Sequence, residues 1–128
     1  MRQCWGLENE INTKELVLKI KLENVNLNSS SGPNSFANKL KKYLLLAGHE
    51  VTDDDHDVVL CFIESDHFSK KKLFQRLDGI YFNSAFDYHK QNKRIKDTYR
   101  KAEGVVFQSY FNKKLTEKYF GSHKNSTI

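Results

Sequence analysis

Apolar residues follow two different periods along the chain, and segments of the two kinds alternate. Short segments rich in β-branched and aromatic residues are typical of strands. Residues 57–63 are apolar without alternation, as expected for a strand covered on both faces. The predicted strands comprise residues 16–22, 49–52, 57–63, 73–80 and 105–107, and residues 126–128 resemble the opening of a sixth.

Three intervening segments carry apolar residues at helical spacing. Pro33 suits a first helical turn and Gly48 a helix end. Asp87 is predicted to cap a second helix, and Gly121 to end a third. The residues expected to share the inner faces are Phe36, Leu40, Tyr43, Leu44 and Ala47; Tyr88, Asn92, Ile95, Tyr99 and Ala102; and Phe111, Leu115 and Tyr119.

This alternation predicts an α/β fold, a Rossmann-like parallel sheet of five or six strands with helices on both faces. A chain of 128 residues is the usual size for one hydrophobic core. We therefore expect a single domain over residues 16–128, preceded by a poorly defined leader at residues 1–15.

Composition changes this picture little. Charged residues make up 29% of the chain, and the formal net charge is +5. Lysines recur on the outer faces of the predicted helices, where a solvated surface explains them. The charge is also compatible with nucleic acid, a phosphate-rich ligand or an anionic membrane. We expect no specific nucleic-acid partner, and leave peripheral membrane contact open.

The cysteine count and apolar segments bear on the compartment. Cys4 and Cys61 form no disulfide framework or metal-ligand spacing. Residues 1–6 lack the apolar centre of a signal peptide, and no apolar stretch approaches the roughly 20 residues that span a bilayer. These features predict a reduced, cytoplasmic protein.

Metal and nucleophile signatures are weak. The acidic residues from Asp53 to Asp57 offer hard-metal ligands, but their spacing is not that of an EF-hand and they enter a strand rather than leave one. The five histidines lack the i, i+4 spacing of a helical zinc pair. We expect neither a metal nor a cofactor, and find no order of residues that supports nucleophilic catalysis.

In parallel α/β sheets, ligands bind outside the carboxyl ends of the strands. The segments that follow the predicted strands at this edge are residues 26–35, 64–66, 78–83 and 108–109. The loop at 29–35 opens a helix, whose N–H groups could hold a phosphate or a sugar hydroxyl. With a single glycine and no suitably placed lysine, it is neither a P-loop nor a dinucleotide loop. By itself the loop is a weak signal, and an ordinary connection between strand and helix is the favoured interpretation.

The sequence Arg76-Leu77-Asp78-Gly79 places an ion-forming pair two residues apart at a strand end, so both side chains project to one side. A carboxylate there could orient a hydroxyl or accept its proton. The alternative is an ion pair that only fastens the turn. Asp78 is therefore our candidate catalytic residue.

Four motifs together resemble the N-terminal domain of glycosyltransferase family 4, a GT-B group, over residues 16–128. The matching segments are Gly32-Pro33-Asn34-Ser35-Phe36-Ala37, Ala47-Gly48-His49-Glu50-Val51, Arg76-Leu77-Asp78-Gly79 and Phe107-Gln108-Ser109 with Phe111-Asn112-Lys113. The resemblance implies an acceptor-binding half that works with a second, donor-binding half, for which these residues provide no segment.

The resemblance also implies site residues. Asp78 lies where an acceptor-contacting strand end is expected. The implied substrate-binding residues are Gly32, Asn34, Ser35, Arg76, Asn83, Tyr88, Asn92, Gln108 and Ser109. The expected partners are a sugar acceptor and, only with a second domain or chain, a nucleotide-sugar donor. Glycosyl transfer by this half alone is not expected.

A second interpretation is a non-catalytic carbohydrate- or nucleotide-binding module on the same fold. Sugar binding without nucleotide binding would distinguish it. A third is a nucleic-acid binder, which would require an affinity that falls steeply with salt. The sequence lacks an aromatic-basic strand motif that would favour this third interpretation.

Overall fold

A computed structural model describes residues 17–66 and 71–128. The predicted leader, Cys4 and His67 lie outside the described residues. Within them, no helix combines the length and apolar character needed to cross a membrane.

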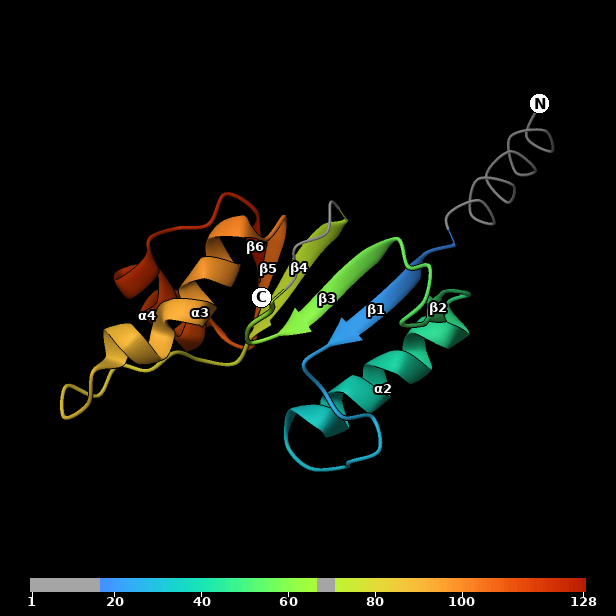
Figure 1. The fold of residues 1–128 in the computed structure, drawn as a ribbon, viewed down its shortest axis with the longest axis horizontal. Helices are drawn as coiled ribbons and strands as arrows, with labels where there is room; N and C mark the ends of the chain where they lie inside the picture. The colour runs from blue at the N-terminus through green and yellow to red at the C-terminus, as the bar shows by residue number, and fades with distance from the viewer. Residues whose placement is uncertain (1–16, 67–70) are drawn as a thin grey trace.

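Six parallel strands form one sheet in the order β2-β1-β3-β4-β5-β6 (Figure 1). This confirms the predicted α/β, Rossmann-like single domain. The strands are β1 (Lys19–Glu23), β2 (Glu50–Val51), β3 (Val58–Phe62), β4 (Lys72–Leu77), β5 (Gly104–Phe107) and β6 (Ser126–Thr127).

The described residues form three helices, α2 (Pro33–Leu46), α3 (Tyr88–Lys101) and α4 (Tyr110–Phe120). The predicted start signals are confirmed, since α2 begins at Pro33 and the Asp87 side chain accepts the Lys90 amide at 3.2 Å. Gly121 ends α4 with φ 88°, a left-handed value that favours glycine.

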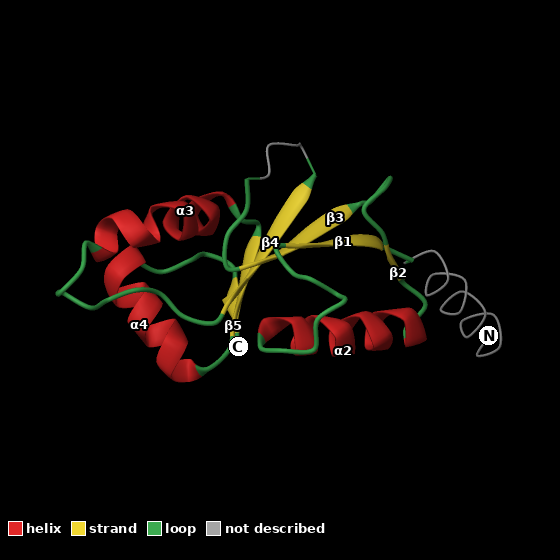
Figure 2. Cartoon of the chain, turned by 60° about the horizontal axis from the view of Figure 1, so that its bottom comes forward, coloured by secondary structure: helices red, strands yellow, loops and turns green. Residues whose placement is uncertain are grey.

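The helices cover both faces of the sheet, as predicted. Figure 2 shows α2 on one side and α3 and α4 on the other. Alternation along β1 and β3 directs Ile20, Leu22 and Phe62 towards α2, where Ala37 is fully buried. The core under α3 and α4 contains Leu77, Ile80, Ile95, Tyr99, Ala102, Val105 and Phe107.

Contacts with residues far along the chain shorten two of the predicted strands. Residues 57–63 were expected as a strand, but the Asp57 carboxylate accepts the Lys19 amide at 2.9 Å and β3 begins at Val58. Residues 73–80 were also expected as a strand. β4 instead ends at Leu77, whose carbonyl accepts the Asn112 side-chain amide at 2.7 Å, before the chain turns towards α3.

Candidate functional site

The sheet has a topological switch point between its neighbouring strands β1 and β3. After β1 the chain passes to α2 on one face of the sheet. After β3 it passes to the other face, where the Ser65 amide donates to Thr98 Oγ1 of α3 at 3.0 Å. Where outgoing segments diverge in this way, a crevice opens outside the strand ends, and such crevices hold ligands in parallel α/β sheets.

Both strand ends at this crevice carry left-handed backbone. Asn24 has φ 64° and Ile63 has φ 73°. Asparagine tolerates this conformation, whereas a β-branched isoleucine does so only under constraint from its surroundings. Asn24 Nδ2 donates to the Phe62 carbonyl at 2.6 Å, and Gln75 Nε2 donates to the Ile63 carbonyl at 2.7 Å. These contacts hold the two bends that open the crevice.

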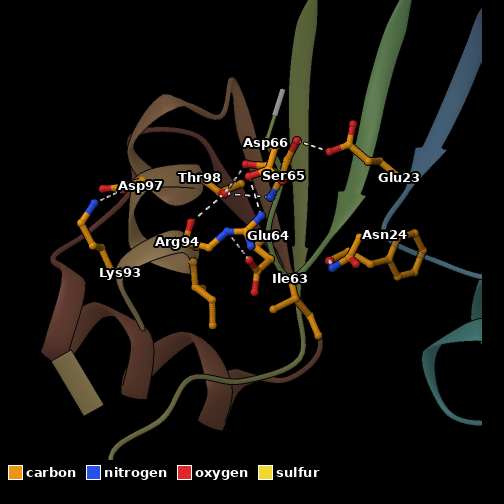
Figure 3. Close-up of polar contacts among 12 residues, drawn as sticks. Glu23, Asn24, Ile63, Glu64, Ser65, Asp66, Lys93, Arg94, Asp97 and Thr98 are labelled. Carbon is orange, nitrogen blue, oxygen red and sulfur yellow. Dashed lines mark hydrogen bonds and ion pairs between the residues drawn. The ribbon is translucent and has the colours of Figure 1, made fainter. Parts of the chain in front are cut away.

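The crevice is a polar, open hollow of about 640 Å³. It is lined by Lys21 and Glu23 of β1, by Asn24 directly after that strand, by Glu64, Ser65 and Asp66 after β3, and by Arg94 of α3. Figure 3 shows Arg94 reaching towards the Glu64–Asp66 segment, with Glu23 on the opposite side of Ser65.

Charges of both signs are paired within this crevice. Arg94 Nε lies 2.8 Å from Glu64 Oε2, and its Nη2 also pairs with Asp66. Ser65 Oγ donates to the Glu23 carboxylate. Carboxylates accept hydrogen bonds while guanidinium and ammonium groups donate them. Such a mixed set is suited to a ligand with several hydroxyl groups.

No group of three or more histidine, cysteine, aspartate or glutamate side chains among residues 17–66 and 71–128 could hold a metal ion. The acidic turn at 53–57 instead makes structural contacts, including a Lys19–Asp55 ion pair at 3.4 Å.

Arg76 and Asp78 form the predicted ion pair at the end of β4. The Arg76 guanidinium carbon lies 3.8 Å from the centroid of the Phe36 ring, which belongs to the first turns of α2. Arg76 is buried and Asp78 is half-buried at the rim. The pair therefore fastens the turn to α2 while leaving part of the carboxylate accessible, so both interpretations of this motif are compatible with its geometry.

The remaining rim residues from the sequence analysis are exposed or half-buried, and several shape the loops. Gly32 adopts φ 53° directly before α2. Asn34 Oδ1 accepts the Asn26 amide at 2.8 Å, and Ser109 caps α4 by accepting the Asn112 amide at 3.1 Å. Ser35 stands in the first turn of α2, and Gln108 is exposed after β5. Asn34, Asp78 and Ser109 thus lie along one rim of the sheet.

Three other predicted residues lie in or beside the loop between β4 and α3. Asn92 is only 3% exposed, and its side chain makes two hydrogen bonds to the Tyr81 backbone, at 2.9 and 2.6 Å. The Tyr88 ring packs against Tyr119, with centroids 5.7 Å apart. Asn83 is exposed, and its Oδ1 accepts the Ala85 amide at 2.9 Å. Each of these side chains holds local structure.

The structure separates two groups at this rim. Glu23 and Arg94 belong to the crevice on the α3 side of the sheet, whereas Arg76 lies against Phe36 on the α2 side. The end of β3 stands between them, because Phe62 pairs in register with Arg76. Residues 64–66 were predicted as a strand end but not as site residues, and Glu23 and Arg94 were not predicted at all.

The buried thiol of Cys61 does not add a nucleophile. Burial, with a smaller contribution from the Glu23 charge, raises the pKa of Cys61 to about 12. The thiol is therefore protonated near neutral pH, and only the thiolate is nucleophilic.

Comparison with known proteins returned no matching family model, no matching curated protein and no matching solved structure.

Proposed function

We propose that this chain is the acceptor-side half of a nucleotide-sugar-dependent glycosyltransferase of the GT-B, family 4 type. One observation carries the proposal. Three of the four segments that resemble the family, at Gly32, Arg76 and Phe107, are far apart in sequence yet lie at one rim, whereas the segment at Ala47–Val51 lies at the opposite end of the sheet. That rim also holds a polar crevice at the switch point of the sheet, where such folds bind ligands.

In this proposal the acceptor occupies the crevice. Glu23 and Asp66 accept hydrogen bonds from its hydroxyl groups, and Lys21 and Arg94 donate to its oxygen atoms. Asp78, held by Arg76 beyond the end of β3, acts on an acceptor that extends past that strand end, where it orients the reacting hydroxyl or accepts its proton. Binding of the donor nucleotide-sugar and exclusion of water require a second domain or chain. A single open rim neither encloses the donor nor keeps water from the reacting atoms.

Calorimetric titration tests this division of labour. The full chain is titrated with simple saccharides and with nucleotide-sugars, alone and together with a separately produced donor half. We expect saccharide binding by the chain alone, and nucleotide-sugar binding and sugar transfer only with the donor half. Tight nucleotide-sugar binding by the chain alone would contradict the proposal.

Variants locate the acceptor. Glu23→Gln and Arg94→Gln should each weaken saccharide binding by about tenfold, the order expected when a charged hydrogen-bonding partner is removed. Lys93→Gln is the matched control, because Lys93 lies next to Arg94 but pairs with Asp97 at 3.1 Å, outside the crevice. An equal loss in the control would argue against binding in this crevice.

A non-catalytic carbohydrate-binding module is the second candidate, because the polar crevice is formed within one chain. The same titrations distinguish it from the transferase half. Saccharide binding that depends on Glu23 and Arg94, without product formation beside any donor half, would favour the module.

A further inference from the structure

The outer face of α2 combines lysines with exposed apolar side chains. Ala37, Leu40 and Leu44 face the sheet. The opposite face carries Lys39, Lys42, Tyr43 and Leu46, spaced at i, i+3, i+4 and i+7. The prediction that Tyr43 lies on the inner face was therefore wrong, because Leu40 and Leu44 occupy that face instead. A helix with one face in the core usually has a charged or polar opposite face. The second half of α2 departs from this pattern.

The exposure of these apolar residues is large. Tyr43 is 67% exposed, Leu45 51% and Leu46 73%. Leu45 and Leu46 also line a shallow hollow of about 400 Å³ along the helix, together with Asn38, Lys41 and Lys42. We call Lys39, Lys42, Tyr43, Leu45 and Leu46 the α2 outer surface. Contiguous exposed apolar groups bordered by polar residues mark contact sites.

The charge of this surface has one sign. Residues Pro33–Leu46 contain three lysines and no acidic residue. No ion pair joins Lys39, Lys41 or Lys42 to another of the described residues. An electrostatic partner for this surface is therefore negatively charged.

We propose that the α2 outer surface rests on a lipid bilayer that contains anionic lipids. Helices that lie in the plane of a membrane place leucine and aromatic side chains at the acyl boundary, while lysines reach the anionic headgroups. Nucleic acid would be attracted by the lysines but offers no counterpart to the adjacent leucines. α2 is also the only described helix on its side of the sheet, so its outer face can meet a flat surface (Figure 2).

The proposal is independent of the enzymatic function proposed above, since it uses none of the crevice residues. It does carry a spatial consequence for that function. α2 begins beside the rim of the sheet, where Phe36 contacts Arg76. A bilayer along α2 would therefore lie on the side of the rim that holds Arg76 and Asp78, across the sheet from the crevice.

Vesicle flotation tests the proposal with the full chain. Vesicles of phosphatidylcholine alone are compared with vesicles of phosphatidylcholine and phosphatidylglycerol in equal amounts. We expect binding to the anionic vesicles to be at least about tenfold stronger than to the neutral ones. Absence of binding to anionic vesicles at low salt would overturn the proposal.

Variants separate this surface from charge in general. Leu45→Ser with Leu46→Ser, and Lys39→Glu with Lys42→Glu, should each reduce binding by about tenfold or more. Lys114→Glu with Lys118→Glu changes the charge equally on exposed residues of α4, across the sheet, and should leave binding within about twofold. An equal loss in that control would show attraction by overall charge and overturn the assignment to α2.

Two further measurements keep the result interpretable. Thermal unfolding followed by circular dichroism should give similar midpoints for all variants, because the substituted side chains are not fully buried. Sedimentation of the unmodified chain should show a monomer. Self-association abolished by the Leu45 and Leu46 substitutions would mean that a second copy covers this surface, and would overturn the bilayer proposal.

Discussion

The two sides of the sheet differ in how they are held and in what they expose. On one side, α2 is the single helix among the described residues and covers β1 and β3, and much of its contact is with half-buried residues such as Leu40 and Leu44. On the other, α3 and α4 enclose a larger group of buried residues around Leu77 and Phe107. Most of the cohesion of the fold is therefore expected on the α3–α4 side.

Charge follows the same division. α3 has six lysines and arginines against one aspartate, and α4 has three lysines against one glutamate. Together they carry a net charge of +7, more than the +5 of the whole chain, so the remainder is net negative. On the α3–α4 side, basic residues form the solvated outer surface of a well-packed layer. On α2, the basic residues lie beside exposed leucines. The same residue type thus has a different setting on each side.

Truncation of a core residue on each side should give the largest difference. Phe107 is 1% exposed and its ring centroid lies 6.4 Å from that of Tyr99. Phe107→Ala should lower the free energy of unfolding by about 3 to 5 kcal/mol, because it leaves a cavity. Leu44→Ala, at a half-buried position under α2, should lower it by only about 1 to 2 kcal/mol. Urea unfolding measures both.

Equal losses in the two variants would contradict the comparison. If Phe107→Ala does not fold, the milder Phe107→Leu replaces it. Its loss in the free energy of unfolding is then compared with that of Leu44→Ala in the same urea experiment.

Alkaline pH should act on the α3–α4 side, where both described groups with raised pKa values lie. The pKa of Cys61 rises from 9.0 to about 12, mainly by burial, and burial followed by the Glu117 charge raises that of Tyr99 from 10.0 to about 12. Between the ordinary pKa of each group and its raised value in the folded protein, the unfolded chain loses a proton that the folded chain keeps. Stability is therefore fully present below pH 9 and is lost as pH rises towards 12.

The Cys61 contribution can be isolated. Unfolding free energies at pH 8 and pH 11 should differ by roughly 2 to 3 kcal/mol more in the unmodified chain than in Cys61→Ala. The difference between the two pH values, rather than stability at either one, is compared, because alanine also leaves a small cavity. An unchanged difference in Cys61→Ala would argue against burial of the thiol.

The smallest expected contrast concerns the loops at the rim. Asn92→Ala removes two hydrogen bonds to the Tyr81 backbone and should cost about 2 kcal/mol. Asn38→Ala, on the α2 side, removes one hydrogen bond to the Ser29 carbonyl, 2.9 Å long, and should cost about 1 kcal/mol. Amide hydrogen exchange at Tyr81 and Ser31 would show which loop loosens. A greater loss for Asn38→Ala would reverse the comparison.

Local signals in the sequence predicted the fold well where each acts within a few residues. Pro33, Asp87 and Gly121 mark helix ends through their own backbone or side-chain chemistry, and each does so in the structure. Strand ends were less predictable. Asp57 and Leu77 end their strands through contacts with residues far along the chain, which no local pattern reveals.

The location of the candidate site could be predicted from the sequence, but most of the residues that line it could not. The rule that ligands bind at strand ends selected residues 64–66 and 78–83, but helical periodicity does not say which exposed residue of α3 reaches the rim. Arg94 does so by pairing with Glu64, 30 positions earlier, so no short motif contains it. Asn92 shows the converse difficulty. A polar residue on an inner helix face can contact a ligand or support the backbone, and the sequence does not distinguish the two. In the structure, the Asn92 side-chain amide is hydrogen-bonded to the Tyr81 backbone.

The bend at Ile63 links the protein interior to the rim. Gln75 is fully buried and cannot touch a ligand, yet its amide holds the Ile63 carbonyl immediately before Glu64, Ser65 and Asp66. The direction of these three residues thus depends on a side chain beneath them. A change at Gln75 could redirect this segment without altering any residue that meets solvent. The arrangement of the polar groups in the crevice therefore depends on a buried residue as well as on the residues that line it.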